Sequence, residues 1–357
     1  MKKFCVFCGN KPENKTSEHI LPMWLLTLTG DPCRIVNLGL NKVGKISERK
    51  YSFDSFKFPA CQECNSKFST LESEIKNVFS KLFDNEILSL NEIDKLFDWF
   101  DKVRIGLWLG FYMLDQNISE IIPNFYINQR ISQWDRVLHI SKVECDQKGL
   151  SFVGCDNPSF SFTPSCFGLI VNNLYFLNVS YDFLFSRRIG FPFPVSKKLL
   201  SNSNAQSVDI DEGLKRIMKP LIRKKFKYEG IELYQPVFSK FIQDPKMKTL
   251  YDNEYVHKNS LDWGKGKGKI FYYHNNEYLP ILENINEFNW NHLERFDIHH
   301  KHALEVLDWQ IFINDLYPAM DELEKNERKR IKKLISFCNS TNRRFIKLYK
   351  EKNEIRI

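Results

Sequence analysis

The sequence predicts an α+β protein with a small N-terminal module, residues 1–85, and a larger mixed domain, residues 86–357. Three observations carry this prediction. Two Cys-x-x-Cys pairs fall within the first 64 residues, apolar residues recur at helical spacing over 68–115, and short β-like runs separated by Gly, Asn and Pro fill residues 136–185. We therefore expect the larger domain to contain an antiparallel sheet, followed by C-terminal helices.

Composition points to a globular protein. Of the 357 residues 43% are hydrophobic and 14% aromatic, which is ample for buried cores. The N-terminus leads from Met1 to Cys5 without an apolar stretch of secretory length, and the longest nearly uncharged apolar run, 105–114, is too short to cross a bilayer. We expect a soluble, cytoplasmic protein with no membrane partner.

The cysteines favour a metal site over a disulfide framework. Their number, nine, is odd and no secretion signal accompanies them. Two pairs with two-residue spacers are the usual form of a four-thiolate zinc site, because zinc–sulfur bonds of about 2.3 Å require both sulfurs of a pair to leave a tight turn on the same side. We expect a structural Zn²⁺ held by Cys5, Cys8, Cys61 and Cys64. The other five are expected to be free buried thiols: Cys33, Cys145, Cys155, Cys166 and Cys338.

The elements of the N-terminal module follow from its patterns. Residues 16–21 are a short extended piece that Pro22 interrupts, and residues 51–58 alternate like a strand that leads to the second cysteine pair. After Cys64, apolar residues recur at helical spacing, so this pair begins a helix. Strand, cysteine knuckle and helix form the layout of a treble-clef-like zinc module, in which the metal replaces the core that so small a unit lacks.

The motif between the cysteine pairs carries a resemblance. The run Glu18-His19-Ile20-Leu21-Pro22 lies between the pairs, and Asn65 directly follows the last cysteine. Together these features resemble the HNH, or ββα-metal (His-Me finger), endonucleases in their zinc-stabilised form, over residues 4–80. The resemblance implies a metal-dependent endonuclease acting on nucleic-acid phosphodiester bonds, with DNA favoured over RNA. It implies that His19 is the general base and that Glu18 and Asn65 bind a catalytic Mg²⁺ or Mn²⁺.

These residue types suit that chemistry. Phosphodiester hydrolysis needs a base to deprotonate water and a divalent cation to neutralise charge on the phosphate. A histidine, with an unperturbed pKa near 6.5, can be that base at neutral pH, and oxygen ligands suit Mg²⁺ or Mn²⁺. Because neighbouring residues of a regular strand point in opposite directions, Glu18 and His19 can face one site only if the strand bends, for which Pro22 is the candidate cause.

Glu72 is a further candidate, and the sequence departs from the family in three ways. Glu72 lies seven residues, about two helical turns, beyond Asn65; it would bind the metal or orient His19, or be a solvated helix glutamate. Fifty-two residues separate the cysteine pairs, the acidic residue before the histidine is Glu rather than Asp, and residues 53–60 lack the family's middle Asn, which Asp54 or Ser55 would replace. These departures support the alternative of a catalytically inactive zinc-module protein that binds nucleic acid.

The larger domain carries hints of a partner. The chain has a net charge of +8, and residues 320–357 hold twelve Lys/Arg against six Asp/Glu, which suits a polyanion such as nucleic acid. Residues 215–227 are either a phosphate-contacting stripe or a solvated basic face, and polar residues 201–213 indicate a loop or linker that could subdivide the domain. Residues 86–357 could also bind a protein partner. By analogy with similar modules, the protein would be an effector in bacterial defence against phage.

Overall fold

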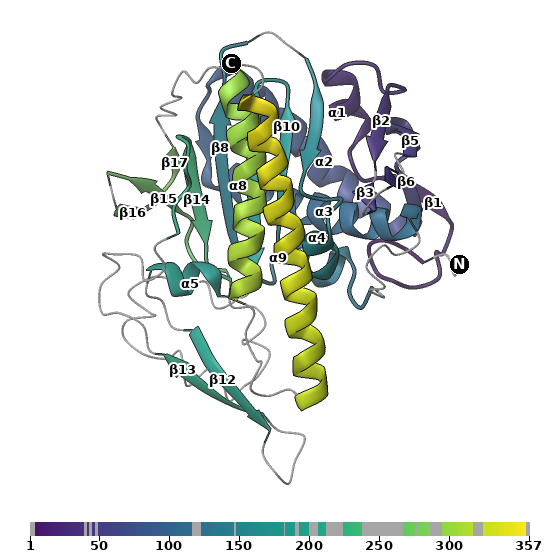
Figure 1. Cartoon of the computed structure of the whole chain (residues 1–357). Helices are drawn as coiled ribbons and strands as arrows, with labels where there is room; N and C mark the ends of the chain where they lie inside the picture. Colours follow the sequence, from purple (N-terminus) through teal and green to yellow (C-terminus); the bar gives the residue numbers. More distant parts are fainter. Residues whose placement is uncertain are drawn as a thin grey trace.

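The structure is a computed structural model that describes residues 4–38, 41–42, 45–46, 49–115, 123–145, 148–181, 183–189, 193–199, 206–211, 224–237, 267–275, 277–285, 295–316 and 324–354. Within these ranges the chain has a mixed α+β architecture, in which helices cover both faces of a central sheet (Figure 1). Most of the expected basic stretch 215–227 lies outside the described residues.

The N-terminal elements form a hairpin followed by a helix. Strand β1 (Thr16–His19) pairs antiparallel with β6 (Lys57–Ala60), and α2 (Gln62–Asp84) begins directly after β6. The long segment between the two strands is an insertion with its own elements. These are α1 (Met23–Leu28), the paired strands β2 (Ile35–Leu38) and β5 (Arg49–Ser52), and the paired strands β3 (Asn41–Lys42) and β4 (Lys45–Ile46).

The strand expected over 51–58 is wrong in its middle. A 3₁₀ turn, η1 (Phe53–Ser55), separates β5 from β6. Phe53, Phe56 and Phe58 are all buried, and their spacing of three and then two residues is met by a turn followed by a strand. Sequence alternation alone does not reveal this change of period.

Two long helices follow, as expected. The apolar residues of α2, from Phe68 to Leu82, are buried, and α3 (Leu90–Asp115) is buried without interruption over residues 99–110. The two helices are joined by a short connection, and they pack against each other. Tryptophan and phenylalanine side chains of α3 therefore belong to the core.

The expected antiparallel sheet is confirmed. It has seven strands in the order β16-β15-β14-β8-β11-β10-β9, and all of its neighbours pair antiparallel. Every residue of β10 and β11 is buried, so both faces are covered, and this explains why these strands read as continuous apolar runs. The strands are β8 (Asp135–Lys142), β9 (Leu150–Val153), β10 (Cys166–Val171), β11 (Leu174–Tyr181), β14 (Ile231–Gln235), β15 (Phe271–His274) and β16 (Glu277–Pro280).

Different helices cover the two faces of the sheet. Phe176 contacts Phe79 of α2 and Phe100 of α3 on one face, whereas its neighbour Leu177 packs in a cluster with Trp309 on the other. Trp309 belongs to α8 (Arg295–Asp315), and α9 (Lys325–Glu354) lies against α8 as the outer helix (Figure 1). The C-terminal helices are thus confirmed as two antiparallel layers outside the sheet.

The shorter elements complete the chain. Strand β12 (Phe193–Leu199) pairs with β13 (Gln206–Asp211), so the loop expected over 201–213 is wrong for residues 206–211. In that stretch Val208 and Ile210 alternate with polar residues, which is a strand pattern. The prediction of a loop followed the polar composition of the segment and missed this alternation. The remaining elements are β7 (Leu88–Ser89), η2 (Ile127–Gln129), α4 (Pro158–Phe162), α5 (Leu184–Ile189) and β17 (Asn284–Ile285).

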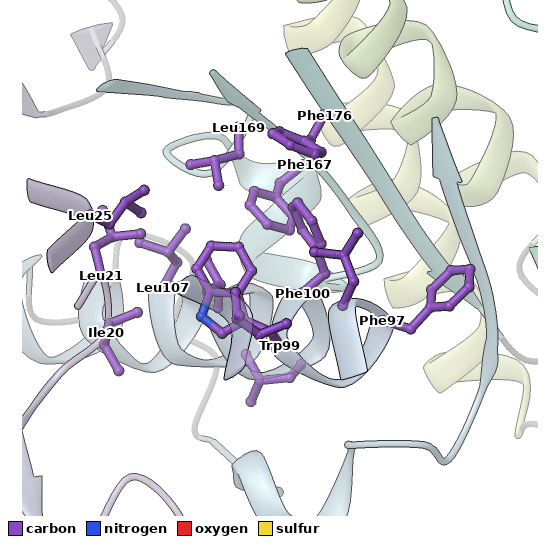
Figure 2. Packing of buried hydrophobic residues seen from close by; sticks show 14 of the residues in the cluster. Ile20, Leu21, Leu25, Phe97, Trp99, Phe100, Leu107, Phe167, Leu169 and Phe176 are labelled. Carbon is purple, nitrogen blue, oxygen red and sulfur yellow. The ribbon is translucent and has the colours of Figure 1, made fainter. Parts of the chain in front are cut away.

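The N-terminal residues share a hydrophobic core with the sheet. In Figure 2, Ile20 and Leu21 lie near Leu107 of α3, while Phe100 lies near Phe167 of the sheet. One spatial cluster of buried residues includes members from both sides of residue 85, from Cys5 to Ile285. No helix in the described part of the chain combines the length and the apolar character needed to span a membrane.

Candidate functional site

Four cysteines converge where the hairpin meets α2. Cys5 and Cys8 lie on a turn closed by Gly9, whose φ of 81° is in the left-handed region that favours glycine. Cys61 follows β6 as the N-cap residue of α2, and Cys64 lies in the first turn of that helix. The four Sγ atoms lie within 4.8 Å of one another, and those of Cys8 and Cys61 are 3.9 Å apart. Tetrahedral bonds of about 2.3 Å would separate sulfurs by about 3.8 Å, so the cluster could hold a structural metal ion such as zinc.

The surroundings of the cluster favour a thiolate at Cys5, whereas burial and the neighbouring sulfurs raise the pKa of Cys8 and of Cys64. The main-chain N–H of Cys61 donates to Cys5 Sγ at 3.3 Å, and that of Glu13 donates to Cys61 Sγ at 3.4 Å. Burial raises the pKa of Cys5, but main-chain hydrogen bonds outweigh it and lower the pKa overall. Burial, together with the charges of Cys5 and Cys8, raises the pKa of Cys64 to about 12. Four adjacent sulfurs thus need a cation before all of them can ionise.

The other cysteines do not form a second cluster among the described residues. Cys155, Cys166 and Cys338 are buried as expected, whereas Cys145 is only partly buried. The expectation is wrong for Cys33, which is exposed in a turn where its N–H donates to Asp31 Oδ1 at 2.8 Å. A polar turn keeps this thiol at the surface.

One side of β1 faces α2 and α3 with polar groups. Asn65 Nδ2, in the first turn of α2, donates to Thr16 Oγ1 at 3.3 Å. Glu18, two residues along the strand from Thr16, is buried with 5% of its side chain exposed. Glu72 lies two turns further along α2 and is half-buried. The structure therefore brings Glu18, Asn65 and Glu72 to one face, called here the acidic face and comprising Thr16, Glu18, Asn65 and Glu72.

A lysine that the sequence analysis missed lies between the two glutamates. Lys102 of α3 has no exposed side-chain surface; its Nζ lies 2.5 Å from Glu18 Oε1 and also pairs with Glu72 Oε1. Burial raises the pKa of Glu18 to about 6, a shift that Lys102 opposes and Glu72 reinforces. The sequence does carry a signal: Lys102 follows Lys95 by seven residues, about two turns of the expected helix, so both lysines lie on one side of it.

As arranged, the acidic face does not fit Mg²⁺ or Mn²⁺. Such ions need oxygen ligands at about 2.0–2.1 Å and usually keep several waters. Here an ammonium group is already within contact distance of both carboxylates, and Glu18 and Lys102 are shut off from solvent. Glu18 and Asn65 were expected to bind a divalent ion, but the ammonium of Lys102 takes up the position beside Glu18 that the ion would need.

His19 leaves the strand on the other side. Pairing of β1 with β6 is regular along all four residues, so no bend turns Glu18 and His19 toward one face. Burial lowers the pKa of His19, the charge of Lys57 lowers it further, and a hydrogen bond between the ring and the main chain of Asp54 opposes both. Nε2 is covered and has no hydrogen-bond partner. Asp54 thus contacts the histidine ring through its main chain.

Comparisons with known proteins add no family. No protein-family model matches the chain, no curated protein matches it, and no solved structure matches it. Any functional assignment therefore rests on the residues and geometry described above.

Proposed function

We propose that the N-terminal module hydrolyses nucleic-acid phosphodiester bonds in the manner of the HNH endonucleases it resembles, with a structural zinc held by Cys5, Cys8, Cys61 and Cys64. One observation carries the proposal: the four sulfurs gather at the junction of β6 and α2, and this junction fixes the strand bearing Glu18-His19 against the helix bearing Asn65. A zinc ion there would cross-link hairpin and helix.

His19 is the base in this proposal. Its lowered pKa keeps the imidazole unprotonated at neutral pH, and its hydrogen bond to Asp54 fixes the ring. Nε2, which has no partner, would accept the proton of a water whose oxygen bonds to phosphorus. The bond from phosphorus to the leaving oxygen breaks in the same step, and the leaving oxygen takes up a proton from solvent water. Since Nε2 is covered in this structure, the reaction requires it to become accessible to that water. No step is assigned to a divalent ion, because Lys102 occupies the acidic face.

Helix α9 supports nucleic acid as the substrate class. It contains eleven Lys/Arg and three Asp/Glu, so its net charge equals the +8 of the whole chain. Lys329, Lys333, Arg343 and Lys347 are exposed and share the side of α9 that faces away from α8. Lys347 lies eighteen residues beyond Lys329, so the helix between them spans about 27 Å, or about eight base pairs of a duplex. We assign this surface, the α9 basic row, to phosphate contact, with DNA favoured over RNA.

Cleavage of plasmid DNA, linear DNA and RNA by the purified protein tests the proposal. We expect cleavage by the wild-type protein and by His274→Ala, which alters an exposed histidine far along the chain. His19→Ala is expected to abolish cleavage while zinc content and thermal stability stay unchanged. Undiminished cleavage by His19→Ala would refute the assignment of the base.

A second candidate is a zinc-module protein that binds nucleic acid without cutting it. Two observations favour it: Lys102 neutralises the acidic face, and Nε2 of His19 is covered. In that case a binding titration shows tight binding, while the cleavage assay shows no products in any buffer. The proposed roles as a phage-defence effector and as a platform for a protein partner through residues 86–357 are tested separately, by phage plating on expressing cells and by activity with candidate partners.

A further inference from the structure

We infer that Lys102 is the resident cation of the acidic face: its ammonium stands between Glu18 and Glu72 where the resemblance places a divalent ion, and replacing it would create a divalent-cation site. The inference rests on the proposed function only for the role of this face. The ion pairs themselves belong to the fold, whether or not the protein cuts nucleic acid.

Burial distinguishes this lysine from an ordinary surface pair. A matched pair lies two turns earlier on the same helix, where Lys95 Nζ is 2.6 Å from Glu74 Oε1 with 28% and 40% of the side chains exposed. Lys102 is 0% exposed, and its partners Glu18 and Glu72 are 5% and 20% exposed. Water screens the first pair but not the second, so the carboxylates around Lys102 need a cation in the folded protein.

The geometry around Lys102 is that of a point charge with two carboxylates. An ammonium has donors on all sides and no acceptor, so two carboxylates can converge on it from different elements, here β1 and α2. The neighbouring charges of α3 point elsewhere, because Arg104 pairs with Asp101 and donates to Asn178 of the sheet. With Lys102 in place, a divalent ion at the same oxygens would be held beside a fixed positive charge.

Replacing Lys102 with methionine changes this balance. Methionine keeps a long apolar side chain in the packed helix but leaves Glu18 and Glu72 facing each other without a counter-ion. Two carboxylates in one partly dry place favour a hard divalent cation, and Asn65 would add an oxygen from the same helix face. Divalent-ion binding should therefore appear on removal of the lysine.

The experiment counts Mn²⁺ bound to the zinc-loaded, full-length protein by electron paramagnetic resonance, with zinc content measured in parallel. We expect Lys102→Met to bind one more Mn²⁺ per chain than the wild type, and to melt at a higher temperature with Mn²⁺ than without it. Lys95→Met, the matched control, should behave as the wild type. Adding Glu18→Gln to Lys102→Met should remove the extra ion.

Two results would overturn the inference. One is folded Lys102→Met that gains no Mn²⁺. The other result is tight Mn²⁺ binding by the wild-type protein that is lost in Glu18→Gln; both of these proteins keep Lys102. Cleavage is scored separately on the same samples, so absence of cleavage counts against the proposed function and leaves the Mn²⁺ count interpretable.

Discussion

Neutralising the α9 basic row should weaken nucleic-acid binding in a way that depends on salt. The perturbation is the simultaneous replacement of Lys329, Lys333, Arg343 and Lys347 by glutamine. These side chains are exposed, whereas α9 is anchored through the buried Ile331, Cys338 and Asn342 on its other side. The helix should therefore remain folded while the row loses four positive charges.

The expected magnitude follows from the number of phosphate contacts. Each contact to duplex DNA contributes about 0.9 to the slope of log K against log salt, so four lost contacts should reduce the slope by about 3.6. Fluorescence anisotropy of a labelled duplex, titrated at several KCl concentrations, measures both the slope and the loss of affinity. The same titration with a single-stranded RNA, for which each contact contributes about 0.7, compares the two substrates.

A matched variant separates the α9 basic row from net charge. Lys50, Lys76, Lys148 and Lys301 are exposed lysines outside α9 and outside residues 215–227, and changing them to glutamine removes the same total charge. We expect this control to keep the wild-type slope to within one contact. If the control lowers the slope as much as the α9 variant does, or if the α9 variant keeps it, phosphate contact by this row is wrong.

Three further predictions concern the metal cluster and the core. Cys61→Ser should lose the bound zinc and unfold the hairpin–α2 junction, as measured by metal content and circular dichroism. Burial lowers the pKa of His139 and of His302 to about 3, far below the pKa of a histidine in the unfolded chain. The unfolded chain therefore binds protons first, and stability falls as the pH drops below about 6.5. Urea unfolding should show a loss of about 2 kcal/mol per histidine by pH 5, and equal stability at pH 7 and pH 5 would contradict this. Gly168→Ala should cost about 1–3 kcal/mol, because its Cβ would lie 2.3 Å from His302 Nε2, whereas Gly149→Ala, with no atom within 4 Å, should melt like the wild type.

Much of the fold was readable because its signals are local. Short apolar runs separated by Gly, Asn and Pro predicted strands of an antiparallel sheet, and helical spacing predicted α2 and α3. The failures arise where two local signals compete. Phenylalanines at 53, 56 and 58 fit a strand until a turn divides them, and the polar residues around 201–213 hide the alternation of Val208 and Ile210.

The candidate site was readable only in part for the same reason. The two cysteine pairs predicted the cluster because the two-residue spacer of each pair is typical of a metal-binding turn. The structure brings the two pairs together across 52 intervening residues. The hydrogen bond between His19 and the main chain of Asp54 has no sequence signal, since any residue at that position offers the same carbonyl. Glu18 and His19 could share a face only if β1 were bent. The sequence could not predict whether β1 is bent, and the structure shows regular pairing.

The apolar spacing of helix α3 predicts its buried side but does not predict the ion pairs of Lys102. Lys95 and Lys102 are seven residues apart and so lie on one side of α3, and both pair with glutamates of α2, Glu74 and Glu72. Helices joined by a short connection run antiparallel, so lysines on one helix and glutamates on the other could have been matched from the sequence alone. The third partner could not. Glu18 lies on β1, which contacts α2 through the hydrogen bond from Asn65 to Thr16 and is flanked by the cysteine cluster; loss of a metal bound by that cluster should therefore also weaken this buried ion pair.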